Sequence, residues 1–200
     1  YYGLDLEVGG IAPGRIADIL IISDLSKIVI DRVIANGKII AENGKLIVDF
    51  PRFTYPEEFK RTVKLKRLIK PKDFEIRSLR VKDGRVKANI IQVMDGKTIT
   101  RRVIEGVPVK NHVVEPDPEK DIVFVAVVER HHLTGNIGKG LARGLGLKAG
   151  AFASTISHDA HNITVIGVNR SDMAIAVNNL AKVGGGMIIV NEGRVKELLK

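Results

Sequence analysis

Cysteine and tryptophan are absent from the 200 residues, and aromatic residues make up only 4% of them. The lack of cysteine excludes disulfides, thiolate metal ligands and cysteine nucleophiles. The scarcity of aromatic side chains, together with the lack of any stacking motif, argues against nucleic acid as a partner.

Long hydrophobic runs are also missing. No apolar run approaches the roughly 20 residues that span a bilayer, and Tyr1-Tyr2-Gly3 does not begin a signal peptide. We therefore predict a cytoplasmic protein with no membrane partner. No methionine lies near the start of the sequence, so we expect a processed or truncated piece of a longer protein.

The net charge of +9 arises from 32 Lys and Arg against 23 Asp and Glu, and the two signs are interspersed along most of the chain. Only residues 60–72 form a basic block. We interpret this block as part of a solvated linker, with an acidic partner as the alternative. A hydrophobic fraction of 44% is enough for one large or two small folded domains.

Turn signals divide the first 50 residues into short strands. Pro13-Gly14 suits a type II turn, and Asn36-Gly37 and Asn43-Gly44 each suit a two-residue hairpin turn between apolar runs. This segment is predicted to be a small antiparallel meander.

The middle of the chain is again strand-like. The turns Asp83-Gly84 and Asp95-Gly96 predict three antiparallel strands at 74–81, 85–94 and 97–104. The continuous apolar run 121–128 predicts a central strand that is covered on both faces.

The last third combines strands with one helix. The glycine-rich run 135–150 has no phosphate-binding spacing, so we expect a closely packed loop or a short helix there. Apolar runs predict strands at 150–156, 163–168 and 187–190. A helix should begin after Asn169 and stop at Gly184. Overall, the sequence predicts a strand-rich α+β fold.

A polar cluster lies between the strands 150–156 and 163–168. Its residues could bind a metal, transfer a proton or hydrogen-bond a polar ring. The structural alternative is an ordinary turn, and a lone His-x-x-His lacks the third ligand of a zinc site. We therefore expect no metal ligand among them. The cluster consists of Ser157, His158, Asp159, His161 and Asn162.

A second cluster, Glu129, Arg130 and His131, follows the predicted central strand. His131 and His132 would point to opposite sides if the strand continued, so both are unlikely to serve one site. We favour His131, because it belongs with Glu129 and Arg130 in the family pattern described below. The alternative is that both are exposed loop histidines.

The first segment resembles the part of the amidohydrolase superfamily that follows the metal-binding barrel and completes a β-sandwich. The resemblance rests on Gly10-x-x-Pro13-Gly14-Arg15-x-Ala17-Asp18-Ile19 and on Val33-Ile34-Ala35-Asn36-Gly37-Lys38. It implies that a barrel should precede residue 1.

The remainder resembles the C-terminal domain of adenine deaminases. The resemblance implies an amidohydrolase-type β-sandwich tail at 1–50, a basic linker at 51–72 and an α+β C-terminal domain at 73–200. It rests on Glu129-Arg130-His131, Thr134-Gly135-Asn136-Ile137-Gly138, Gly144-x-Gly146-Leu147-Lys148-x-Gly150-Ala151, Ser157-His158-Asp159-x-His161-Asn162, Asp172-Met173 and Gly184-Gly185-Gly186.

The resemblance implies hydrolysis of adenine to hypoxanthine and ammonia in purine salvage, with manganese or iron bound by a His-x-His motif and other barrel residues. No His-x-His occurs here, so we expect a chain that binds no cofactor itself and is inactive alone. Its expected partners are adenine, the missing N-terminal barrel and further copies in a homo-oligomer.

Our hypothesis is that residues 129–131 and 157–162 close over the mouth of the missing barrel and exclude water. His158, Asp159 and His161 would then transfer a proton or orient the substrate. Substrate binding would fall to Ser157, Asn162, Glu129, Arg130 and His131. The alternative function is assembly alone, with the polar clusters satisfying turns at a subunit interface.

Overall fold

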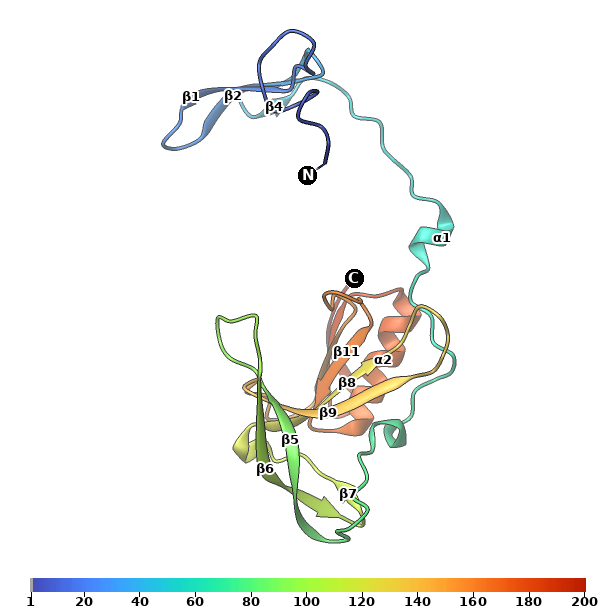
Figure 1. Ribbon diagram of the computed structural model, residues 1–200. Helices are drawn as coiled ribbons and strands as arrows, with labels where there is room; N and C mark the ends of the chain where they lie inside the picture. The colour runs from blue at the N-terminus through green and yellow to red at the C-terminus, as the bar shows by residue number, and fades with distance from the viewer. Residues whose placement is uncertain (1) are drawn as a thin grey trace. The chain divides into compact units, whose positions relative to one another are not determined.

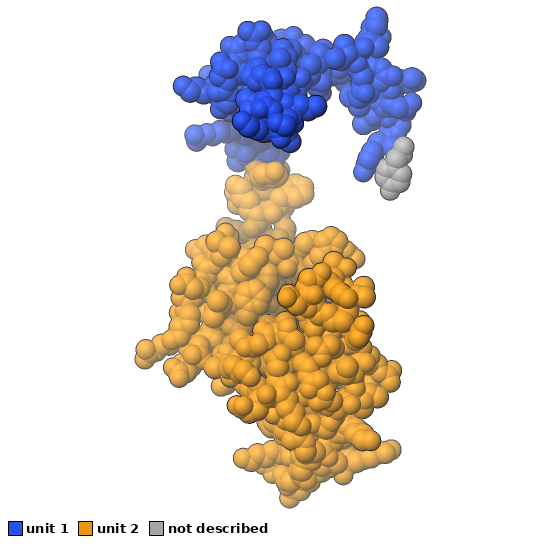
Figure 2. Space-filling view, turned by 90° about the vertical axis from the view of Figure 1, so that its left-hand side faces the viewer, with its two compact units in different colours: residues 1–54 blue, residues 55–200 orange. Residues whose placement is uncertain are grey.

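The computed structural model describes residues 2–200. It divides into two compact units, unit 1, which extends to Thr54, and unit 2, Tyr55–Lys200 (Figure 2). No helix among the described residues is long and apolar enough to cross a bilayer.

Unit 1 is the predicted antiparallel meander (Figure 1). Both Asn-Gly pairs have positive φ at each residue, 48° and 75° at Asn36-Gly37 and 49° and 75° at Asn43-Gly44, as the predicted hairpin turns require. Pro13-Gly14 also forms its predicted turn, since the Arg15 amide donates to the Ala12 carbonyl at 3.2 Å. The strands are β1 (Ile19–Asp24), β2 (Val29–Ala35), β3 (Lys38–Glu42) and β4 (Lys45–Leu46).

None of the described residues of unit 1 is buried. Apolar side chains on its strands, such as Leu20 at 51% and Leu46 at 66%, remain exposed. A sheet becomes stable by burying an apolar face against a second layer. Unit 1 therefore has the apolar residues for one layer of a core but not the second layer.

Unit 2 is built on a nine-stranded sheet in the order β13-β12-β10-β11-β8-β9-β5-β6-β7. All neighbours are antiparallel except β5 and β9. The strands are β5 (Gly84–Gln92), β6 (Arg101–Lys110), β7 (Val113–Val114), β8 (Ile122–Val128), β9 (Ile137–Arg143), β10 (Ala151–Ser154), β11 (Ile163–Gly167), β12 (Met187–Asn191) and β13 (Arg194–Leu199). Together with one long helix, this confirms the strand-rich α+β class.

The helix α2 (Arg170–Val183) packs on β10, β11 and β12 and covers one face of the sheet. It begins as predicted, because the Asn169 side chain accepts hydrogen bonds from the amides of Ser171 at 2.8 Å and Asp172 at 3.3 Å. It ends at Gly184, whose φ of 91° is the left-handed conformation that glycine adopts most easily.

Strand β8 is central, as predicted, but only one face of it is fully covered. Phe124, on the side of α2, is 2% exposed, whereas Val127 on the opposite face is 40% exposed. On β9, the partner of Val127 is Gly138, which has no side chain. The uncovered apolar surface runs toward the end of the sheet where the polar loops begin.

One predicted strand and one predicted loop or helix were wrong. Residues 74–81 do not form a strand: the 3₁₀ turn η1 (Pro71–Phe74) occupies the start, and only Arg77 forms a bridge, to Val113. The Asp73 carboxylate accepts from the Lys70 amide at 2.7 Å and thereby favours the turn. The glycine-rich run contains the strand β9, not a loop or helix.

The third predicted strand is shifted along the chain, since β6 begins at Arg101 and not at residue 97. It forms a long hairpin with β5, which joins β9 through only two residue pairs, Ile91 with Ala142 and Gln92 with Arg143.

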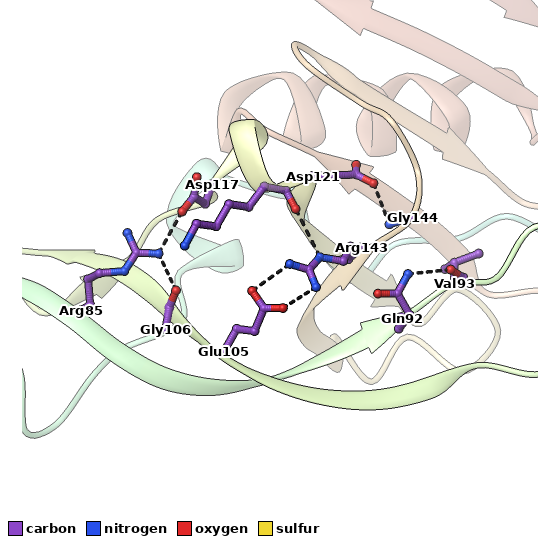
Figure 3. A network of polar contacts seen from close by, with 10 residues as sticks. Arg85, Gln92, Val93, Glu105, Gly106, Asp117, Asp121, Arg143 and Gly144 are labelled. Carbon is purple, nitrogen blue, oxygen red and sulfur yellow. Dashed lines mark hydrogen bonds and ion pairs between the residues drawn. The ribbon is translucent and has the colours of Figure 1, made fainter.

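Polar contacts strengthen this short junction (Figure 3). Arg143 on β9 makes a forked contact with the Glu105 carboxylate on β6, with one branch at 2.7 Å. Arg85 on β5 contacts Asp117 at 2.9 Å. Side-chain contacts therefore add to the short backbone pairing in holding the hairpin to the central strands.

The basic connector also differs from the expected solvated linker. A four-residue helix, α1 (Glu57–Lys60), follows Pro56, but residues 62–69, which we call the strap, are docked on the rest of unit 2. Ile69 is 6% exposed, and its amide and carbonyl both bond to the Asn178 side chain on α2, each at 2.9 Å. Val63 and Leu65 pack against the core. The linker interpretation was thus wrong for the strap.

The strap should depend on Asn178. The substitution Asn178→Ala leaves two backbone groups of Ile69 without partners, so we expect urea unfolding of unit 2 to lose about 1–3 kcal/mol of stability. Asn179→Ala is the matched control, because Asn179 bonds only to the carbonyl of Ile175 in its own helix, at 2.8 Å. Equal losses in the two variants would contradict a docked strap.

Candidate functional site

The two polar clusters lie at the same end of the sheet. Loop 129–136 joins β8 to β9, and loop 155–162 joins β10 to β11. Val128 pairs with Ile163 and Ser154 pairs with Thr164, so both loops leave the sheet at the same end of these strands. We call them the first loop and the second loop.

Glu129 organises the first loop. One carboxylate oxygen accepts hydrogen bonds from the amides of His131 and of His132, the latter at 2.6 Å. The other oxygen accepts from the amide and the hydroxyl of Thr134, both at 2.9 Å. These bonds, that of the His132 amide foremost, lower the pKa of Glu129 to about 2.

Arg130 joins the first loop to two other segments. Its side chain is buried and donates to the carbonyl of His161, and also to the carbonyl and hydroxyl of Thr62 at 3.1 and 3.2 Å. Its amide donates to the Asn162 side chain at 3.3 Å. None of the carboxylates in the described part of the chain forms an ion pair with Arg130. Desolvation lowers the pKa of this guanidinium.

His131 provides another bond between the loops. Its Nε2 lies 2.8 Å from the carbonyl oxygen of Ala160. A carbonyl oxygen can only accept, so this nitrogen carries the hydrogen. Both His131 and the adjacent His132 are exposed, and their ring centroids are 6.2 Å apart.

The second loop presents three titratable side chains to solvent. Nδ1 of His158 contacts a carboxylate oxygen of Asp159, and these side chains are 87% and 90% exposed. The His161 ring centroid is 6.0 Å from that of His158. An exposed ion pair contributes little to stability. The contact between His158 and Asp159 therefore contributes little to the stability of the second loop, and its side chains are accessible to a ligand.

The remaining predicted site residues have contacts within the loops. Ser157 shares a 2.6 Å hydrogen bond with the Thr164 hydroxyl, and Asn162 accepts from the Arg130 amide. The fold thus brings the two predicted clusters together. Glu129, Arg130, Ser157 and Asn162 form hydrogen bonds within or between the loops, and the His131 ring bonds across them. The rings of His158 and His161 are exposed. Thr62 was not predicted as a site residue, because it lies 68 positions before Arg130 and is part of the strap.

The side chains of the two loops could in principle ligate a metal ion. Across residues 2–200, no group of three or more His, Cys, Asp or Glu side chains is arranged to hold a metal ion. The described side chains of the two loops therefore do not by themselves provide a ligand set for manganese or iron.

Fold and site together define a mostly β domain that presents imidazoles and a carboxylate on two interlocked loops. Residues 97–200 match the family described as the adenine deaminase C-terminal domain. The chain belongs to this family.

Known relatives match over nearly the whole chain. It is 43% identical over 198 residues to an adenine deaminase of Moorella thermoacetica, covering 99% of this chain and 33% of that protein. An adenine deaminase of Staphylothermus marinus is 44% identical over 192 residues, which cover 96% of this chain and 32% of that protein. The chain spans about a third of the length of these curated relatives.

The low pKa of Glu129 predicts how the first loop responds to acid. Because the folded pKa of about 2 lies below the unperturbed 4.5, the carboxylate stabilises the loop above pH 4.5 and loses this effect as the pH falls toward 2. NMR shifts of the His131, His132 and Thr134 amides should titrate with a midpoint near 2. A midpoint near 4.5 would contradict the hydrogen bonds, and Glu129→Gln should abolish the transition.

Arg130 should contribute to the stability of unit 2. Arg130→Met retains the apolar stem but leaves the carbonyls of Thr62 and His161 without this donor, at an expected cost of about 1–3 kcal/mol. Urea unfolding measures the loss, with Arg80→Met, a change at an exposed arginine, as the control. No difference between the two variants would mean that the guanidinium does not hold the three segments.

Proposed function

We propose that the chain is the closing domain of an adenine deaminase, which hydrolyses adenine to hypoxanthine and ammonia in purine salvage. Its family membership and the names of its relatives support the enzyme class. The observation that carries the proposal is the exposed His158 and Asp159 pair, with His161 beside it, on a loop held in place by Arg130.

The chemistry requires a proton at the departing amine. Imidazole is the side chain best suited to transfer protons near neutral pH. Asp159 holds Nδ1 of His158, which leaves Nε2 to exchange a proton with the amine nitrogen. His161 is close enough to orient the ring or to take part in the same transfer.

Substrate binding is proposed for the neighbouring polar groups. Asn162 uses its carbonyl oxygen for the Arg130 amide, so its amide nitrogen can donate to a ring nitrogen of adenine. The Ser157 hydroxyl and the His131 ring lie on the same pair of loops. These three residues would recognise the polar edge of the purine.

An exposed imidazole–carboxylate pair is a poor catalyst while water surrounds it. His158 and Asp159 are 87% and 90% exposed. Proton transfer becomes specific when a site is closed and water is excluded. We therefore propose that the two loops close over the mouth of a barrel-bearing part of the parent protein, which would hold the manganese or iron.

Unit 1 supports the same partner. Its sheet exposes apolar side chains and buries none of its described residues, so it needs a second layer. In the proposal, the barrel-bearing part provides that layer, and this chain alone is inactive.

The histidines provide the test. In a full-length adenine deaminase that carries this chain, His158→Ala and His161→Ala should lower turnover of adenine by roughly 10² to 10⁴. The bound metal, measured by elemental analysis, should be unchanged. His112→Ala is the control, because His112 lies in the turn between β6 and β7 and bonds to the Ser78 carbonyl at 3.2 Å. Loss of metal would instead make these histidines ligands.

Assembly is the second candidate function. It is favoured by exposed apolar side chains on the last two strands of the sheet, Ile189 at 45% and Leu199 at 66%. A homo-oligomer formed through this surface would explain them. The same histidine variants separate the two functions, since normal turnover with altered oligomer size would favour assembly.

A further inference from the structure

We infer that Glu129 is a positioning residue, which fixes the first loop so that His131 holds the second loop, and that it does not bind substrate. The expected effect of Glu129 on turnover rests on the proposed function. The positioning of the loop by Glu129 rests only on the hydrogen bonds described below.

The carboxylate of Glu129 has no acceptor capacity left for a ligand. A carboxylate offers about four lone-pair sites on its two oxygens. Four donors already occupy them: the amides of His131 and His132 on one oxygen, and the amide and hydroxyl of Thr134 on the other. A purine amine could bond to Glu129 only by displacing one of these donors.

The backbone conformation of the first loop depends on the hydrogen bonds that Glu129 accepts. Leu133 has a φ of 55° and Gly135 a φ of 77°, so two residues of the loop adopt left-handed backbone. This conformation is unfavourable for leucine and persists only where the surroundings determine it. The backbone turns around the carboxylate and directs three amide groups to it.

The position of His131 connects this turn to the second loop. The amide of His131 is bonded to Glu129, while its Nε2 bonds to the carbonyl of Ala160. Ala160 lies between Asp159 and His161 in the sequence. Any change in the turn around Glu129 therefore displaces the residue that separates two of the proposed catalytic side chains.

Arg130 provides parallel bonds between the same loops, from its amide to Asn162 and from its side chain to the His161 carbonyl. These bonds should keep the loops together when Glu129 is changed. The variants at Glu129 should consequently fold, with the loop position altered.

Two substitutions separate charge from geometry. Glu129→Gln retains one acceptor oxygen and replaces the other with an NH2 group, which then faces donors on one side of the turn, either the amides of His131 and His132 or the donors of Thr134. Glu129→Asp retains both oxygens on a shorter side chain and should restore part of the effect. Glu119→Gln is the control, because Glu119 is an exposed acid in the turn η2 (Pro118–Lys120) of the same unit.

Hydrogen exchange of the 200-residue chain, followed by NMR, tests the loop. In Glu129→Gln, the amides of His131, His132 and Thr134 should exchange at least about tenfold faster, while those of β8 keep their protection. Glu129→Asp should lie between, and Glu119→Gln should match the parent chain. Unchanged exchange of the three amides in Glu129→Gln would overturn the inference.

Kinetics in the full-length adenine deaminase test the link to turnover. Positioning predicts that Glu129→Gln lowers kcat with little change in KM for adenine, and that Glu129→Asp recovers part of kcat. A raised KM with normal kcat would identify Glu129 as a substrate ligand and overturn the inference. If His158→Ala leaves turnover normal while the exchange result holds, the proposed function fails and the positioning of the loop stands.

Discussion

The guanidinium of Arg130 is the contact on which the candidate site depends. It carries a positive charge into a buried position without a carboxylate partner and satisfies it with carbonyl oxygens of the strap and the second loop. Burying a charge is costly unless its hydrogen bonds are made. This cost is offset only when the first loop, the second loop and the strap are all in place. The site can therefore form only when these three segments of unit 2 have folded together.

The sheet determines where that site lies. Antiparallel β8, β10 and β11 bring both polar loops to one end of the sheet. That end of unit 2 combines exposed imidazoles with the exposed Val127 on β8. Unit 1 exposes apolar side chains on a sheet in which no described residue is buried. Both features fit a domain of the adenine deaminase family that spans a third of its relatives.

Local signals in the sequence predicted the parts that local interactions determine. Asn36-Gly37 and Asn43-Gly44 form turns because only their own backbone conformations matter, and Asn169 caps α2 with its own side chain. The glycine-rich β9 was missed, because its strand is specified by pairing with β8 and not by alternation of its own residues. The strap was missed because Asn178 binds it from 109 positions away.

The candidate site was predicted in the same way. Both polar clusters were found from their residue types, and the fold places them side by side. What could not be predicted was which side chains would be bonded within the loops, because the partners of Arg130 and His131 come from other segments. The prediction that the cluster residues bind and transform adenine stays a prediction.

The most direct test is adenine deamination by this 200-residue chain with added manganese, beside a protein in which the chain is joined to the remaining two thirds of a relative's length. Activity only in the longer protein is the predicted result and would support a closing domain. Activity in the chain alone would contradict the account, because residues 129–162 would then contain a complete catalytic site.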